Sequence, residues 1–309
     1  MNTPLRGWLA DYLSVRRTLG FKLHGYDAQF VRFISYLEEI GVEKITIDDA
    51  VTWAAQPVGV HPSSWSRRLS MVRGFATYVK TLDPATEIPP ADLLAARPPR
   101  ATPYLYSDTE IAALLDAGNG LGTPFQAATT STVVALLAAT GMRVGEAIRL
   151  DRSDVDFPTE SLTVRETKFG KSRELPLHPT TAKALRAYLD RSDRPRVTRN
   201  NTAIFVTVTG TRIKYVTILD AFHEMIKGAG LQPRSASCRP RLHDLRHTFA
   251  VRTMIDFYRA GGNVQARLPL LSTYLGHLDP STTYWYLSAA PELMSLAGDL
   301  LQRHLGENA

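Results

Sequence analysis

The sequence has almost no cysteine. Cys238 is the single one among 309 residues, so no internal disulfide can form. It also lacks an apolar run of about 18 or more residues, which a membrane-spanning helix needs. The first residues, MNTPLRGWLADYL, lack the continuous apolar stretch and small-residue cleavage site of a signal peptide. We therefore expect a protein that has no membrane partner and works in the reducing cytoplasm.

Acidic residues are slightly outnumbered. The chain has 30 Asp and Glu against 36 Lys and Arg, a net charge of +6. This balance alone points only weakly to nucleic acid. Its distribution is more informative, because residues 191–215 and residues 227–252 each hold six basic side chains and one acid. Each stretch could neutralise DNA phosphates or could equally be a solvated surface.

Residues 5–80 show helical periodicity and no strand signal. Leu5, Trp8, Leu9, Tyr12 and Leu13 have i, i+3, i+4 spacing, and similar sets follow at Phe30–Leu37 and Trp65–Val79. Gly41 is placed to end one helix, and Thr46 with Asp49 resembles a capping box that starts another. The pattern predicts a small helical domain.

Prolines then become dense, at positions 84, 89, 90, 98, 99 and 103. Prolines at this spacing prevent a continuing helix and favour an extended connector. We therefore predict a helical domain over residues 1–97, a proline-rich linker over 98–106 and a second domain over 107–309.

The second domain is predicted to be mainly helical with a small antiparallel sheet. It opens with a capping box, Ser107 and Glu110, and an apolar helix at 131–139 ends at Gly141. The segments SLTVRE and RELPL alternate apolar residues, and TKFGKS between them suits a hairpin turn. AIFVT reads as another short strand, and helical patterns return after about Lys214.

Several short motifs in this domain carry side chains suited to phosphate chemistry. They are Arg143 in TGMRVGEAIRL, Lys168 on the predicted hairpin, His243 and Arg246 in HDLR, His277 in YLGH, and Tyr286 in STTYWYL. Each has an ordinary reading when taken alone: a surface charge, a solvated lysine, a helix cap or a packed aromatic ring. Tyr284 lies two residues before Tyr286 and would point to another side of a helix.

A metal site is the rival reading of one motif. HDLRH places His243 and His247 at i, i+4, close to the zinc-binding pattern H-E-x-x-H. Its acid is the shorter Asp244, Arg246 would put a cation beside the metal, and no third ligand is signalled. We therefore expect no metal and no other cofactor.

The full set, in its order along the chain, resembles the tyrosine recombinases, or phage-integrase-like site-specific recombinases. The matching pieces are ATGMRVGEAIRL, TKFGKSRELPL, LHDLRHTFA and YLGHLDPSTTYWYL, which together cover most of the second domain. The helical first domain and proline-rich linker resemble that family's core-binding (SAM-like) domain. The stretch between Arg246 and His277 is longer than in simpler bacterial members, and the terminal segment is similar to recombinases of transposons and integrative elements.

The resemblance implies that DNA strands are cleaved and rejoined through a 3′-phosphotyrosyl link, without metal or ATP. Arg143 and Arg246 would hold the phosphate, His243 would accept or relay a proton, and His277 would add a hydrogen bond. Lys168 would protonate the leaving oxygen and Tyr286 would be the nucleophile. The implied partners are double-stranded recombination sites, bound by a homotetramer on two paired sites.

Two other functions share these features. A DNA-binding regulator could keep the fold without catalysis, although all six expected residue types are present. A topoisomerase-like enzyme could use the same chemistry to relax DNA. The leucines at 293, 296, 300 and 301 have helical spacing, and could pack on their own domain or dock onto a neighbouring protomer.

Overall fold

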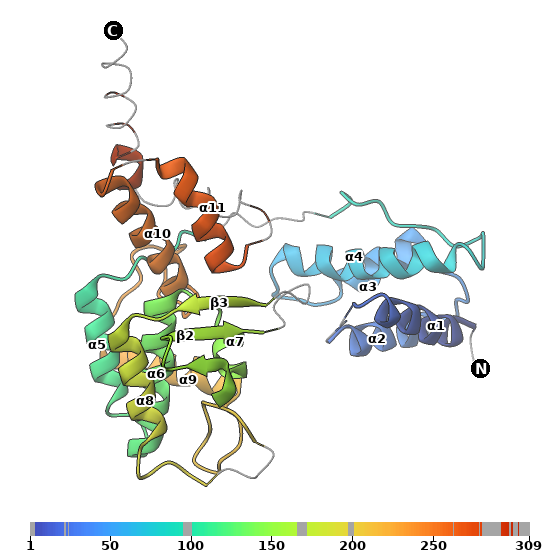
Figure 1. Cartoon of the computed structure of the whole chain (residues 1–309). Helices are drawn as coiled ribbons and strands as arrows, with labels where there is room; N and C mark the ends of the chain where they lie inside the picture. Colours follow the sequence, from blue (N-terminus) through green and yellow to red (C-terminus); the bar gives the residue numbers. More distant parts are fainter. Residues whose placement is uncertain are drawn as a thin grey trace. The chain divides into compact units, whose positions relative to one another are not determined.

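The structure is a computed structural model. It describes residues 4–21, 23, 25–94, 101–165, 172–196, 201–261, 263–277, 279, 292–296, 298 and 302. The chain divides into two compact units, Met1–Arg100 and Ala101–Ala309. Both are mainly helical (Figure 1). Within the described ranges, no helix is long and apolar enough to span a membrane.

The first unit is built from helices, as the sequence predicts. They are α1 (Pro4–Thr18), α2 (Tyr26–Glu39), α3 (Ile47–Ala55) and α4 (Pro62–Val79). Their apolar faces meet in one core, in which Phe33 and Trp53 pack edge to face with ring centroids 5.1 Å apart. Thr46 caps α3 by accepting a hydrogen bond from the Asp49 backbone, so that start signal is confirmed.

The second unit contains the remaining elements. These are α5 (Asp108–Gly118), α6 (Pro124–Thr140), α7 (Val144–Arg149), the 3₁₀ helix η1 (Arg152–Asp154), β1 (Val155–Asp156), β2 (Ser161–Val164), β3 (Arg173–Pro176), α8 (Pro179–Leu189), α9 (Tyr215–Gly228), α10 (Asp244–Arg259) and α11 (Val264–Leu275). Ser107 and Glu110 form both hydrogen bonds of the expected capping box. The predicted fold class, mainly helical with a small antiparallel sheet, is confirmed.

The sheet has the order β1-β2-β3, and both strand pairs are antiparallel. Leu162 of β2 lies opposite Leu175 of β3, and both are fully buried against the helices. Val164 is paired with Arg173 at the end of the ladder, next to the segment 166–171, which lies outside the described residues. β3 therefore brings Arg173 to the end of the ladder next to the predicted Lys168 turn.

Two local predictions differ from the structure. AIFVT is not a strand of the sheet: Ala203 and Val206 form only isolated bridges, with Asp151 and Arg212. Its buried β-branched and aromatic side chains reflect packing in the core rather than a ladder. The apolar helix predicted over 131–139 is longer, because Thr123 caps α6 and Pro124 is its first residue.

A separate apolar cluster lies between α10 and α11. Met254 and Leu275 are fully buried in it, and so is Leu293 of the C-terminal segment. Glu292 forms an ion pair with Arg259 at the end of α10, at 2.6 Å. At Leu293 the C-terminal segment therefore packs on its own domain.

Candidate active site

Arg143 lies in a sharp turn between two helices. α6 ends at Gly141, which has a left-handed backbone (φ 60°), and Arg143 is the extended N-cap of α7. A Cβ on Gly141 would lie 2.4 Å from Cδ1 of Phe249, so only glycine fits this turn. The turn directs the chain away from α6 and places Arg143 at the start of α7.

Glu146 holds Arg143 in place. Oε1 of Glu146 accepts a hydrogen bond from Nη1 of Arg143 at 2.8 Å, and Oε2 accepts one from the Arg143 backbone at 3.0 Å. Glu146 is only 4% exposed, so its charge needs partners inside the protein. The contact fixes both the backbone and the guanidinium of Arg143.

A second arginine, Arg173 of β3, completes the surroundings of this carboxylate. Its Nη2 lies 2.8 Å from Oε2 of Glu146 and its Nη1 lies 3.2 Å from Oε1. Its Nε donates to the carbonyl oxygen of Tyr274 at 2.8 Å. Burial alone would raise the pKa of Glu146, but hydrogen bonds from Arg173 and Arg143 outweigh it and lower that pKa to about 2.

Arg246 and Arg143 meet at the end of α11. Arg246, which is 3% exposed, donates from Nη1 to the carbonyl of Gly141 at 2.8 Å and from Nη2 to that of Leu275 at 2.7 Å. Arg143 donates from Nη2 to the next carbonyl, that of Gly276, at 3.1 Å. Two guanidinium groups that are 103 positions apart therefore bind adjacent carbonyl groups.

His277 follows this last turn directly. α11 ends at Gly276 with φ 69°, and the backbone N–H of His277 donates to the carbonyl of Ser272 at 2.9 Å. His243 is the N-cap residue of α10, three residues before Arg246. The structure therefore brings together Arg143, His243, Arg246 and His277, four of the six residues predicted from the sequence.

The positive surroundings also act on the two histidines. Desolvation by the surrounding protein, followed by the charges of Arg246 and Arg143, lowers the pKa of His243 to about 4. The same causes lower the pKa of His277 to about 4. The side chain of His243 is at the same time exposed to solvent. Both imidazoles are neutral at pH 7, and each has one nitrogen that can accept a proton.

The zinc reading of HDLRH gains no support from the geometry. Asp244 is fully buried, and its carboxylate accepts two hydrogen bonds from Arg241, at 2.8 and 2.9 Å. The rings of His243 and His247 meet edge to face at 4.8 Å. Among the residues that the structure describes, no group of three or more His, Cys, Asp or Glu side chains is arranged to hold a metal ion.

Lys168, Tyr284 and Tyr286 lie outside the described residues. The chain on either side of them is placed: Arg173 follows the first segment, and His277 precedes the second. Arg173 contacts the last turn of α11 through the carbonyl of Tyr274, and His277 directly follows that turn.

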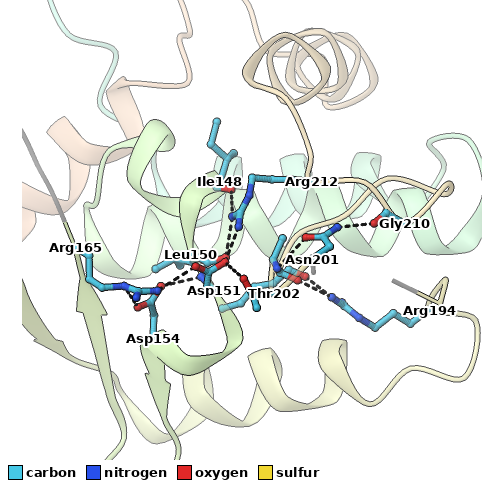
Figure 2. Close-up of polar contacts among 12 residues, drawn as sticks. Ile148, Leu150, Asp151, Asp154, Arg165, Arg194, Asn201, Thr202, Gly210 and Arg212 are labelled. Atoms are coloured by element: carbon cyan, nitrogen blue, oxygen red, sulfur yellow. Dashed lines mark hydrogen bonds and ion pairs between the residues drawn. The ribbon is translucent and has the colours of Figure 1, made fainter. Parts of the chain in front are cut away.

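Several arginines of the two basic stretches are engaged within the protein. Arg212 forms an ion pair with Asp151 at 2.5 Å and donates to the carbonyls of Ile148 and Leu150, while Arg194 donates to two backbone carbonyls (Figure 2). In the second stretch Arg234, Arg241 and Arg252 form ion pairs with acidic side chains. These arginines are engaged with acidic side chains or carbonyl groups of the protein itself, so a count of basic residues along the sequence overstates the charge available to a partner.

Sequence reasoning missed Glu146 and Arg173. Glu146 lies three residues after Arg143, which is the spacing of a capping box, so this signal was available. Arg173 was noted only as part of a strand, RELPL, and its partners are distant in sequence.

Comparison with known proteins decides the family. Residues 106–292 match the phage integrase family. An integrase/recombinase of Sinorhizobium fredii, y4rB, is 40% identical over 307 residues, which cover 97% of this chain and 98% of that protein. The chain belongs to the phage integrase family. It is a tyrosine-type site-specific recombinase, and the resemblance drawn from the motifs is confirmed.

More distant similarities are to a named tyrosine recombinase and to a solved structure with a similar fold. The tyrosine recombinase XerC of Alcanivorax borkumensis is 25% identical over 283 residues, covering 90% of this chain and 87% of that protein. The structure of the Tn1549 transposon integrase in complex with transposon right end DNA is 18% identical. It superposes with a TM-score of 0.66 and covers 95% of this chain and 98% of that chain.

Proposed function

We propose that this recombinase cleaves DNA at the site formed by Arg143, His243, Arg246 and His277, with Lys168 and Tyr286 completing it. The observation that carries the proposal is the meeting of Arg143 and Arg246 at adjacent carbonyl groups directly before His277. A phosphodiester under attack spreads negative charge over its non-bridging oxygens. Two guanidinium groups fixed beside each other offer planar, permanently charged donors for that charge.

The histidines complete the binding of the phosphate. His243 accepts or relays the proton that Tyr286 must lose when its hydroxyl attacks, since a free tyrosine has a pKa of about 10. The depressed pKa of His243 leaves its imidazole neutral and able to take that proton. His277 donates a hydrogen bond to an oxygen of the developing charge.

Lys168 acts as the general acid and Tyr286 as the nucleophile. The 5′-oxygen leaves poorly without a proton, and a lysine ammonium on the turn before β3 can supply it. The phosphotyrosyl bond conserves the energy of the broken phosphodiester, so a second strand's hydroxyl can reverse the step without ATP. The two arginines take the charge-stabilising role that a metal ion has in other phosphoryl-transfer enzymes.

The partners follow from this chemistry. The substrates are two double-stranded recombination sites, and joining them needs a homotetramer in which each protomer supplies one nucleophile. The Tn1549 integrase of the comparison is bound to transposon end DNA, which supports a mobile-element role for this chain too. Residues 1–97 and the catalytic domain 107–309 both bind DNA, residues 98–106 link them, and the enzyme works in the cytoplasm.

A two-site plasmid assay tests this function. A supercoiled plasmid carries two copies of the DNA that flanks the gene, since recombinases of mobile elements act near their own genes. The proposal expects products in which the DNA between the sites is exchanged. Relaxation of supercoils without exchange identifies a topoisomerase-like enzyme instead, and binding without any strand breakage identifies a regulator.

A further inference from the structure

We propose that Arg173 is a positioning residue for DNA cleavage: it neutralises Glu146, so that Arg143 keeps its positive charge for the phosphate. The inference rests on the proposed function, because it concerns how one of the proposed phosphate-binding arginines is kept available. Arg173 is outside the set of six residues that the sequence motifs predicted.

The contacts show how fully Glu146 is engaged. Its two oxygens accept four hydrogen bonds, two from Arg143 and two from Arg173. The side chain of Glu146 is 3% exposed and that of Arg173 is 11% exposed, so solvent screens this group weakly. The carboxylate is shared between two cations and does not belong to either alone.

The charge balance of this group gives Arg173 its role. One carboxylate between two guanidinium groups leaves a net charge of +1 beside the proposed phosphate position. Without Arg173, Glu146 and Arg143 would form a neutral pair, and Arg143 would be the only ionic partner of a buried carboxylate. The attraction for a phosphodiester that carries one negative charge would then be lost at this end of the site.

Arg173 also supports the second group that Arg143 contacts. Its Nε donates to the carbonyl of Tyr274, two residues before Gly276, whose carbonyl accepts from Arg143. The ring of Tyr274 stacks on Phe249 of α10, with centroids 5.5 Å apart. One side chain on β3 therefore holds both neighbours of Arg143, the carboxylate and the end of α11.

Arg212 provides a matched control for a purely structural role. It too pairs with a carboxylate, that of Asp151, and donates to two backbone carbonyls, those of Ile148 and Leu150 (Figure 2). In the part of the chain that the structure describes, these partners differ from the groups to which Arg143 and Arg246 donate. If Arg173 acts only as a buried ion pair, Arg173→Met and Arg212→Met should impair the enzyme in the same way.

The experiment compares variants on a nicked duplex that carries the recombination site, selected from the DNA flanking the gene by covalent capture with the unmodified enzyme. Capture by the unmodified enzyme comes first, and its failure would refute the proposed function rather than this inference. For each variant we measure the dissociation constant for the duplex and the rate of covalent adduct formation at saturating DNA. All measurements use a temperature at which circular dichroism shows every variant folded.

Arg173→Met is expected to slow adduct formation about 100-fold at saturating DNA, the order seen when a transition-state charge partner is removed. Its dissociation constant should change less than about threefold, since one contact among many contributes little to DNA affinity. Arg173→Lys restores the positive charge but not the two-pronged guanidinium. It should form the adduct about tenfold or more faster than Arg173→Met. Arg212→Met should stay within about threefold of the unmodified enzyme in both quantities.

The double variant Glu146→Gln/Arg173→Met gives the most discriminating comparison. It removes the carboxylate that would neutralise Arg143, so it should form the adduct faster than Arg173→Met. It also removes a buried carboxylate that has lost one of its two cationic partners, so if Arg173→Met does not fold, the double variant is compared with the unmodified enzyme, whose adduct rate it should approach within about tenfold. The inference is overturned if the double variant is no faster than Arg173→Met, or if Arg173→Met behaves like Arg212→Met or loses only affinity.

Discussion

Arg143 donates a hydrogen bond to the carbonyl oxygen of Gly276, although the two residues are 133 positions apart in the sequence. The contact joins the start of α7 to the end of α11, directly before His277. Arg246 reaches the neighbouring carbonyl of Leu275 from α10. Separate helix termini are thereby held together, and the proposed phosphate-binding site is their meeting point.

This meeting point makes Gly276 sensitive to substitution. A Cβ at Gly276 would lie 2.8 Å from Nη1 and 3.0 Å from Cζ of Arg173, and φ is +69°. Gly276→Ala should therefore lower the free energy of unfolding by more than the 1–2 kcal/mol or so of a left-handed alanine, and it should slow cleavage. Urea unfolding and adduct formation measure the two effects.

Gly230→Ala is the control for that substitution. Gly230 has a similar φ of +66°, but nothing lies within 4 Å of its Cβ position. The free energy of unfolding of Gly230→Ala should fall by only about 1–2 kcal/mol, and the folded variant should cleave DNA normally. Equal losses of cleavage rate in the two variants would show that the end of α11 does not shape the site.

Lys168→Ala should slow cleavage with little loss of DNA affinity. One exposed cation supplies at most one phosphate contact, which changes the slope of log binding constant against log salt concentration by about 0.9. The proposed chemical role of Lys168 is instead to protonate the leaving oxygen. A 5′-phosphorothiolate substrate, whose sulfur leaves without a proton, should restore the rate of the variant. A variant that stays slow on this substrate would remove Lys168 from the role of acid.

Cleavage should survive an excess of EDTA. In the proposed mechanism Arg143 and Arg246 provide the charge that a metal ion would otherwise supply, and Asp244 of HDLRH is already paired with Arg241. The measurement is adduct formation after dialysis against the chelator. Loss of activity that Zn²⁺ or Mg²⁺ restores would favour the metal reading of that motif.

Stability should fall between pH 7 and pH 5. Desolvation first, and nearby positive groups second, lower the pKa of His277 to about 4 and that of His247 to about 3. At pH 5 the unfolded chain therefore binds more protons than the folded one, and unfolding becomes easier by about 4 kcal/mol for the two histidines together. Asp244, whose pKa is raised by burial, acts in the opposite direction.

Urea unfolding at both pH values measures this loss. His247→Gln, which removes one of the titrating rings, should lose less stability between pH 7 and pH 5 than the unmodified protein. An equal loss in both proteins would mean that His247 titrates normally in the fold.

Local signals predicted much of the fold. Ser107 with Glu110 and Thr46 with Asp49 mark helix starts through contacts three residues apart, and such contacts are visible in a sequence. The strand predicted at AIFVT was wrong. Its residue types suit a strand, but strand formation depends on a pairing partner that the sequence does not show.

The motifs in the sequence predicted the candidate site. Arg143, His243, Arg246 and His277 were proposed from their residue types and order, and the structure brings these four residues together. Arg173 could not be found in this way, because its contacts span 27 positions to Glu146 and 101 to Tyr274. Those distances are closed only by the fold of the sheet against α7 and α11.

The central claim is that Tyr286 attacks the phosphate held by Arg143 and Arg246. The most direct test traps the covalent adduct on a nicked duplex, digests the protein and identifies the tyrosine that carries the DNA phosphate. The account predicts a phosphate on Tyr286, no adduct with Tyr286→Phe, and an adduct that persists with Tyr284→Phe. A phosphate on Tyr284, or an adduct that survives in Tyr286→Phe, would contradict it.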